Sequence, residues 1–254
     1  MGLPSRRVVL TRAHADNAAL KRRLSRLGFS VWEQPTAAFV DILTPHDRSE
    51  MLRQLRSVQA VTFTSPHAVS AWQRQIGAAP LQEAIASGTV IAAVGHLTAR
   101  ALKRLDIGAC SPAAQSQTGE QLAEMLATKL RAVPNASVLM AQAEHARPEL
   151  GLALRAHGIQ TIATPLYANV APPCPRLPRL RLLEAADVIY FAAPSAADRL
   201  LGWHPALRQR RIVAIGPTTA QELLQRHGLR AAAVAQSPNL TDVVAAIVKV
   251  IENT

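Results

Sequence analysis

Short apolar runs alternate along the chain with longer segments in which apolar residues recur every three or four positions. Leu20, Leu24 and Leu27 show this helical spacing. The apolar runs have no polar alternation, as expected of parallel strands that helices cover on both faces. These runs are VVLT (8–11), AVTFT (60–64), VIAAVG (90–95), SVLMA (137–141), VIYFA (188–192) and IVAIG (212–216). The pattern predicts alternating strands and helices, and therefore an α/β fold.

The pattern also repeats. Residues 8–35 align without a gap on residues 138–165, so that several apolar, glycine and proline positions coincide: Val8 with Val138, Leu20 with Leu150, Leu24 with Leu154, Gly28 with Gly158, and Pro35 with Pro165. Two further pairs follow in the same order, 61–72 with 189–200 and 93–102 with 214–223. Internal similarity of this kind indicates duplicated units. We predict two similar domains, each a parallel sheet flanked by helices.

Residues 214–224, AIGPTTAQELL, read as a strand, a tight turn and the start of a helix. Gly216 permits the turn, Pro217 suits the first helical position, and Thr218 or Thr219 would accept a hydrogen bond from a free helix N–H group. A helix start of this kind is an anion site. The alternative is that these residues only cap a structural helix.

Open parallel sheets bind ligands at the carboxyl ends of their strands. The turns expected there offer small side chains and backbone N–H groups: Thr11-Arg12, Thr64-Ser65-Pro66, Gly95-His96, 142–147, Ala193-Pro194-Ser195 and 216–219. They contain no carboxylate pair, no nucleophile with an evident base, and no Walker or GxGxxG loop. Binding by turns and helix ends is therefore favoured over catalysis by a strong acid and base.

Composition narrows the ligand class. The 254 residues carry a formal net charge of +11, and of the 28 basic residues only four are lysines. Arginine suits bidentate capture of carboxylate or phosphate, although an arginine-rich chain can also reflect codon usage. Nucleic acid is a weaker candidate, because 4% aromatic residues are too few for a stacking platform.

No apolar run approaches the roughly 20 residues of a membrane span, and the first residues lack the apolar core of a signal peptide. We therefore expect a cytoplasmic protein. Cys110 and Cys174 lie far apart, without a CxxC motif or a nearby histidine at ligand spacing, so neither a disulfide framework nor a metal site is expected.

Five segments in this order and spacing resemble the uroporphyrinogen-III synthase family: FTSPHAV (63–69), AVGHLTARAL (93–102), TPLYANV (164–170), FAAPSAAD (191–198) and AIGPTTAQELLQRHG (214–228). The likeness spans almost the whole chain. It implies two domains joined by two strand-like linkers, near 36–42 and 166–172. The first domain would be discontinuous, with residues 1–36 and 172–254, and the second would hold 37–171. The repeat alone suggests simple halves.

The resemblance also implies an activity. The family cyclises hydroxymethylbilane, a linear tetrapyrrole with eight carboxylates, to uroporphyrinogen III with loss of water and inversion of the last ring, and it uses no cofactor. Hydroxymethylbilane is then the partner to expect, with transient handover from hydroxymethylbilane synthase, and the protein would be a monomer that binds neither nucleic acid nor membrane. Such a reaction demands that the enzyme fix the substrate's conformation.

Carried over position by position, the resemblance gives Tyr167 as the residue that donates a hydrogen bond or proton to the departing hydroxyl. The alternative is a linker tyrosine that covers the seam between domains. The expected substrate-binding residues are Arg12, Thr64, Ser65, His67, Gly95, Arg147, Ser195, Gly216, Pro217, Thr218 and Thr219.

The chain departs from the family pattern at three of these loops. In one of them, residues 95–98, His96 and Leu97 stand where the second copy has Pro217 and Thr218, so unequal contributions of the two domains are expected. Ala192 and Ala193 stand where the first copy has Thr64 and Ser65, and the segment around Arg147 is less glycine-rich than usual. A rival from another class is a non-catalytic two-domain binding protein for a small anion. Turnover of hydroxymethylbilane separates the two.

Overall fold

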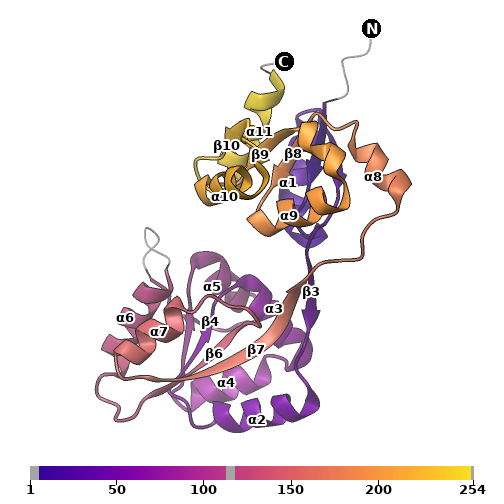
Figure 1. The fold of residues 1–254 in the computed structure, drawn as a ribbon. Helices are drawn as coiled ribbons and strands as arrows, with labels where there is room; N and C mark the ends of the chain where they lie inside the picture. The colour runs from indigo at the N-terminus through magenta and orange to yellow at the C-terminus, as the bar shows by residue number, and fades with distance from the viewer. Residues whose placement is uncertain (1–5, 113–117, 253–254) are drawn as a thin grey trace. The chain divides into compact units, whose positions relative to one another are not determined.

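The computed structural model describes residues 6–112 and 118–252, apart from the side chains of Leu177 and Pro178. The chain forms two compact units, Met1–Ala38 with Val170–Thr254, and Phe39–Asn169. Each unit holds its own sheet and its own helices (Figure 1). The predicted α/β class with two similar sheets is confirmed.

The first unit has the strand order β10-β9-β8-β1-β2, and all four strand pairs are parallel. In chain order its elements are β1 (Arg7–Leu10), α1 (His14–Arg26), β2 (Ser30–Glu33), α8 (Leu177–Leu183), β8 (Val188–Phe191), α9 (Pro194–Trp203), the 3-10 helix η1 (Pro205–Gln209), β9 (Arg211–Ala214), α10 (Pro217–His227), β10 (Ala233–Val234) and α11 (Leu240–Glu252).

The second unit has the order β3-β7-β6-β4-β5. Its sheet is mixed through β3, whereas the pairs from β7 to β5 are parallel. Its elements are β3 (Ala38–Asp41), α2 (Pro45–Leu55), β4 (Ala60–Phe63), α3 (Pro66–Gln75), α4 (Ala79–Ala86), β5 (Val90–Ala93), α5 (His96–Lys103), α6 (Gly119–Leu130), β6 (Ser137–Ala143), α7 (Glu149–Ala156) and β7 (Gln160–Val170).

The predicted repeat is present in three dimensions. Strands β1, β2, β8 and β9 of the first unit correspond in order to β6, β7, β4 and β5 of the second. Gly28 and Gly158 end the matching helices α1 and α7 with φ of 83° and 76°, a left-handed conformation that glycine adopts without the steric cost of a Cβ atom. The aligned leucines at 20, 24, 150 and 154 are all buried.

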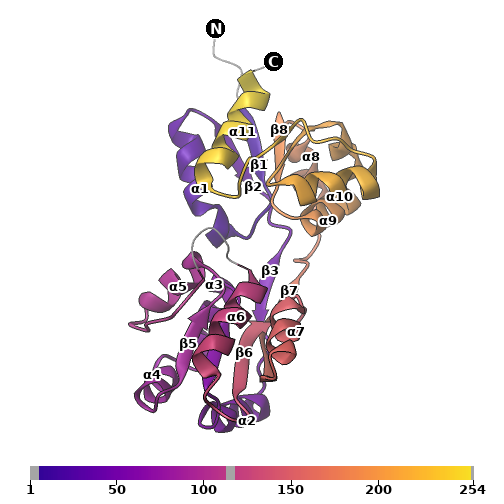
Figure 2. The same cartoon turned by 90° about the vertical axis from the view of Figure 1, so that its left-hand side faces the viewer.

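Each sheet is covered on both faces, which explains its continuous apolar strands. In β1, Val8 and Leu10 pack toward α1 and α11, whereas Val9 packs toward α8, α9 and η1. Figure 2 shows α1 and α11 together on one face of this sheet and α8, α9 and α10 on the other. The second sheet likewise lies between α6 and α7 on one face and α2 to α5 on the other. No helix in the described ranges is long and apolar enough to cross a bilayer.

Candidate functional site

An open pocket of about 680 Å³ lies in the second unit, where α3, α6 and α7 begin. The first residues of a helix expose unpaired N–H groups and a partial positive charge, so three such ends around one pocket favour an anionic or hydrogen-bond-accepting guest. The lining residues are Thr64, Ser65, Val94, Thr118, Gly119, Glu120, Ala143, Ala146, Arg147, Glu149, Leu150 and Tyr167.

Tyr167 is the aromatic residue of this pocket and is held from several sides. Its hydroxyl lies 2.9 Å from Oγ of Ser65, and either hydroxyl can be the donor. The same Oγ accepts a hydrogen bond from the backbone N–H of Ala68 at 3.1 Å, so Ser65 also caps α3. The ring of Phe39 meets the Tyr167 ring edge-on at 5.7 Å. Tyr167 is thus largely buried, with 6% of its surface exposed, and it lines the pocket.

A β-bulge directs this side chain. The pairing of β6 with β7 runs in register up to Gln142 with Pro165 and then skips, so that Ala143 pairs with Tyr167. Leu166 is the extra residue. Consecutive strand residues normally face opposite sides, yet Leu166 and Tyr167 pack in the same apolar core. The bulge therefore turns Tyr167 toward α3 and Ser65, in the way that bulges re-aim side chains near functional sites.

His67 and Gly95 lie next to the pocket without lining it. The His67 ring stacks on Phe39, with centroids 3.7 Å apart, and its centroid is 6.1 Å from that of Tyr167. Gly95 is the N-cap of α5 in extended conformation and follows Val94, which does line the pocket. Of the predicted residues, the pocket thus brings together Thr64, Ser65, Arg147 and Tyr167.

The remaining predicted residues belong to the first unit, at the ends of neighbouring strands. Arg12 follows β1, Ser195 lies in the first turn of α9 after β8, and residues 216–219 follow β9. Because carboxyl ends of parallel strands share one edge of a sheet, these residues line one edge. The side chain of Arg12 is 39% exposed and lies 4.0 Å from Asp16.

A family model described as uroporphyrinogen-III synthase HemD matches residues 18–245. The chain belongs to the uroporphyrinogen-III synthase family. The match covers most of the chain and both units, so the family's place in tetrapyrrole biosynthesis applies to this protein, which is an enzyme. The non-catalytic binder considered from the sequence is not favoured.

Solved structures of uroporphyrinogen-III synthases share the fold. A mutant enzyme from the extremely thermophilic bacterium Thermus thermophilus is 20% identical with a TM-score of 0.63, covering 98% of this chain and 99% of that one. The enzyme from Helicobacter pylori is also 20% identical, with a TM-score of 0.66 over 96% and 99% of the two chains. Among curated proteins, no sequence matches this chain.

Sequence reasoning missed the contribution of α6 to the pocket. Thr118 caps this helix by accepting a hydrogen bond from the N–H of Gln121 at 3.3 Å. A threonine followed three residues later by glutamine is a recognised helix-start signal, and it would have indicated this end. A Cβ atom added to Gly119 would lie 3.1 Å from Cβ and from N of Leu150, so glycine lets α6 and α7 approach closely.

The charged side chains of this pocket are also unexpected for a carboxylate-binding site. Arg147 is exposed, and the exposed carboxylates of Glu120 and Glu149 stand in the first turns of α6 and α7. Side chains therefore supply one positive and two negative charges. Attraction for a carboxylate here would come from Arg147 and from backbone N–H groups, and the two glutamates oppose it.

One expectation for α10 is wrong. Neither Thr218 nor Thr219 caps this helix: the N-cap is Gly216, and no side chain accepts a cap bond. The two threonines lie past the cap, where Thr218 is exposed and Thr219 is buried at 4% exposure. Pro217 occupies the first helical position as predicted. Gly216 is extended, with φ of −175°, and has open space where a Cβ would lie, so this turn does not require glycine.

The first unit contains the chain's second tyrosine, Tyr190. Burial raises its pKa to about 12, while the nearby charge of Arg12 acts in the opposite direction. Its backbone carbonyl accepts a hydrogen bond from the Thr11 hydroxyl at 2.8 Å. Tyr190 is 1% exposed and is therefore a core residue rather than a site residue. Within the described residues, no three His, Cys, Asp or Glu side chains gather as a metal site would require.

Proposed function

We propose that the chain acts as a hydro-lyase on hydroxymethylbilane, closing it to uroporphyrinogen III with loss of water and inversion of the last pyrrole ring. The observation that carries the proposal is the Ser65 to Tyr167 hydrogen bond in a pocket bounded by three helix starts. Family membership supplies the substrate class.

In this proposal Tyr167 acts on the departing hydroxyl. The phenol donates its proton to the oxygen of that hydroxyl, and the lone pair of the pyrrole nitrogen stabilises the positive charge on the carbon that carried it. The carbon–oxygen bond then breaks, water leaves, and an azafulvene cation forms. When the rings recombine, a ring proton is released and restores the phenol. If Ser65 donates its own hydroxyl hydrogen to the phenol oxygen, the Tyr167 proton points away from Ser65, and the start of α3 stabilises negative charge that develops on that oxygen.

The charges support different roles for the two units. The first unit carries 17 of the 28 basic side chains and eight of the 17 acidic ones, whereas the second carries 11 and nine. We propose that the first unit supplies most of the long-range attraction for eight carboxylates. The helix start at 216–219, whose free N–H groups do not include Pro217 because proline has none, and Arg12 would hold carboxylates of the substrate, with Ser195 nearby.

The second unit would hold the reacting ring. Thr64, Ser65 and Tyr167 offer hydroxyls, Val94 and Leu150 offer an apolar wall, and the two glutamates suit the positive charge of the azafulvene better than they suit a carboxylate. Arg147, His67 and Gly95 complete this half. We propose no cofactor, because positioning and one weak acid suffice to steer the spiro route.

The decisive experiment is an isomer assay. Purified protein is mixed with freshly generated hydroxymethylbilane, the products are oxidised to porphyrins, and the isomers are separated by chromatography. We expect isomer III, whereas heat-inactivated protein should give only the isomer I of spontaneous closure. Exclusive isomer I from native protein would refute the proposal. The monomeric state, the cytoplasmic location and handover from hydroxymethylbilane synthase remain predictions, testable by sedimentation, fractionation and coupled kinetics.

A further inference from the structure

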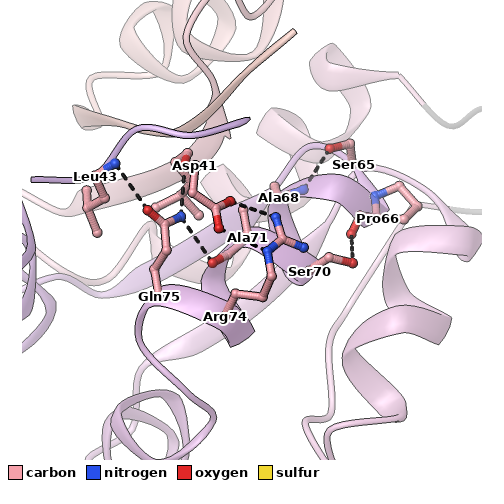
Figure 3. A network of polar contacts seen from close by, with 10 residues as sticks. Asp41, Leu43, Ser65, Pro66, Ala68, Ser70, Ala71, Arg74 and Gln75 are labelled. Carbon is pink, nitrogen blue, oxygen red and sulfur yellow. Dashed lines mark hydrogen bonds and ion pairs between the residues drawn. The ribbon is translucent and has the colours of Figure 1, made fainter. Parts of the chain in front are cut away.

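Helix α3 contacts the pocket at its first residues and the strands β3 and β7 at its last residues. At its start, Ser65 caps the helix and shares a hydrogen bond with the Tyr167 hydroxyl. At its end, Arg74 contacts Asp41, and Gln75 contacts Leu43 and Ala71, as Figure 3 shows. Arg74 forms a two-pronged ion pair with Asp41 of β3, with nitrogen–oxygen distances of 2.9 and 2.6 Å. One end of this short helix therefore contacts Tyr167 of β7, and the other end contacts the neighbouring strand β3.

The amide of Gln75 bridges three backbone groups. Its Nε2 donates to the carbonyl oxygens of Ala71 at 3.1 Å and Leu166 at 2.9 Å. Its Oε1 accepts from the backbone N–H of Leu43 at 3.1 Å. The side chain is only partly exposed. A carboxamide is the side-chain group that offers two N–H donors beside a carbonyl acceptor, so glutamine fits this set of partners and a carboxylate does not.

The contact to Leu166 is the important one. Leu166 is the extra residue of the β-bulge and has no partner in β6, so its carbonyl accepts instead from Ile42 N–H at 3.2 Å and from Gln75. That carbonyl belongs to the peptide group that joins Leu166 to Tyr167. Because a peptide group is planar, holding its carbonyl oxygen also fixes the N and Cα atoms of Tyr167, from which its side chain leaves the backbone.

We propose that Gln75 is a positioning residue for Tyr167. It holds the bulged peptide from the end of α3, while Ser65 holds the phenol from the start of the same helix. The catalytic part of this inference rests on the proposed role of Tyr167 in the reaction. The alternative is that Gln75 only ties the strands to α3, and neighbouring Arg74 provides the matched comparison, because it binds β3 through Asp41 without an observed bond to β7.

The experiment uses the two tyrosines of the chain as reporters. Full-length protein labelled with ¹³C at the tyrosine ring gives one set of signals for Tyr167 and one for Tyr190, assigned with Tyr167→Phe. Gln75→Met and Gln75→Glu should shift or broaden the Tyr167 signal and leave that of Tyr190 unchanged. Arg74→Met should leave both unchanged. Gln75→Glu keeps the shape and the acceptor for Leu43, so it provides a second variant if Gln75→Met does not fold.

Kinetics provide the second readout. Displacement of the Tyr167 hydroxyl should slow the chemical step without weakening substrate binding. Both Gln75 variants should therefore lower kcat about tenfold and change KM by less than about twofold. In the Tyr167→Phe background they should cost nothing further. An unmoved Tyr167 signal, or the same loss in both backgrounds, would overturn the inference.

The two proposals fail separately. If native protein gives no isomer III, the proposed function is refuted, and the tyrosine signals still decide whether Gln75 positions Tyr167. If Tyr167→Phe alone leaves turnover unchanged, the catalytic role of Tyr167 is refuted, whereas its positioning is again decided by the spectra.

Discussion

Arg199 Nη1 lies 2.7 Å from the carbonyl oxygen of Thr36 and 3.4 Å from that of Val170. Thr36 precedes β3, and Val170 ends β7. One guanidinium on α9 thus joins the two places where the chain leaves the first unit and returns to it.

We expect Arg199→Met to lower the free energy of unfolding by about 1–3 kcal/mol, because two partly buried carbonyl groups lose a charged donor. Urea denaturation of the whole chain measures this. Arg22→Met serves as the control, since Arg22 is exposed on α1 and should change stability by less than about 0.5 kcal/mol. Equal effects from the two variants would contradict a fastening role for Arg199.

Tyr167→Phe should slow isomer III formation about tenfold without abolishing it, because a neutral phenol is a modest acid whose loss removes one hydrogen bond to the transition state. The ring contact with Phe39 stays, so thermal unfolding should change little. The isomer assay gives the rate. Tyr190→Phe, in the core of the first unit, should keep full activity, and a full rate for Tyr167→Phe would remove this residue from the mechanism.

The two threonines of α10 should behave differently when each is replaced by alanine. Thr218→Ala should raise KM and leave stability unchanged, since Thr218 is exposed at the start of the helix. Thr219→Ala should lower the free energy of unfolding by about 1 kcal/mol, because Thr219 is buried. Steady-state kinetics and urea denaturation separate the two effects. An unchanged KM for Thr218→Ala would move the substrate contact away from this turn.

Gly119→Ala should destabilise the second unit by about 1–3 kcal/mol, because its new methyl group would press on the backbone of Leu150 at 3.1–3.2 Å. Gly202→Ala is the control within a helix. Nothing lies within 4 Å of a Cβ there, so alanine should stabilise by about 0.5–1 kcal/mol through helix propensity. Opposite shifts in melting temperature are expected, and a neutral Gly119→Ala would show that α6 and α7 can separate freely.

Tyr190 makes stability depend on alkaline pH. Burial raises its pKa from 10 to about 12, so between these values the folded chain keeps a proton that the unfolded chain has lost. Its contribution is complete below pH 10 and is lost as pH rises through about 12, at most about 2–3 kcal/mol. Denaturation from pH 9 to 12 should show a steeper decline for the native chain than for Tyr190→Phe. Parallel curves would contradict this.

The sequence was sufficient for the parts of the fold that depend on local pattern. The apolar runs identify the central strands because each is buried on both faces, and the paired Gly28 and Gly158 mark a helix end that needs positive φ in both copies. The family resemblance named Thr64, Ser65 and Tyr167 separately as site residues, and all three line one pocket. Their roles in the reaction stay a prediction.

Other features depend on contacts between residues that are distant in sequence. The bulge at Leu166 is defined by the register of β7 against β6, and that pairing joins residues more than twenty positions apart, so the local pattern of β7 does not predict it. In the sequence Gln75 is an ordinary polar residue at a helix end, and only Leu43 and Leu166, 32 and 91 positions away, give it a role. The threonines of α10 were misread because a cap depends on the exact residue at which the helix begins.

The division of the chain has a consequence for biosynthesis. The second unit is one uninterrupted stretch, Phe39–Asn169, whereas β1, an interior strand of the first sheet, pairs with β8, which begins at Val188. As the polypeptide emerges from the ribosome, the inserted unit can finish folding while the amino-terminal β-α-β segment still lacks its partner. Polar replacements at Val8 or Leu24 should weaken the packing of this amino-terminal segment before β8 is made. They should therefore reduce the yield of folded protein in cells more than their effect on the free energy of unfolding would predict.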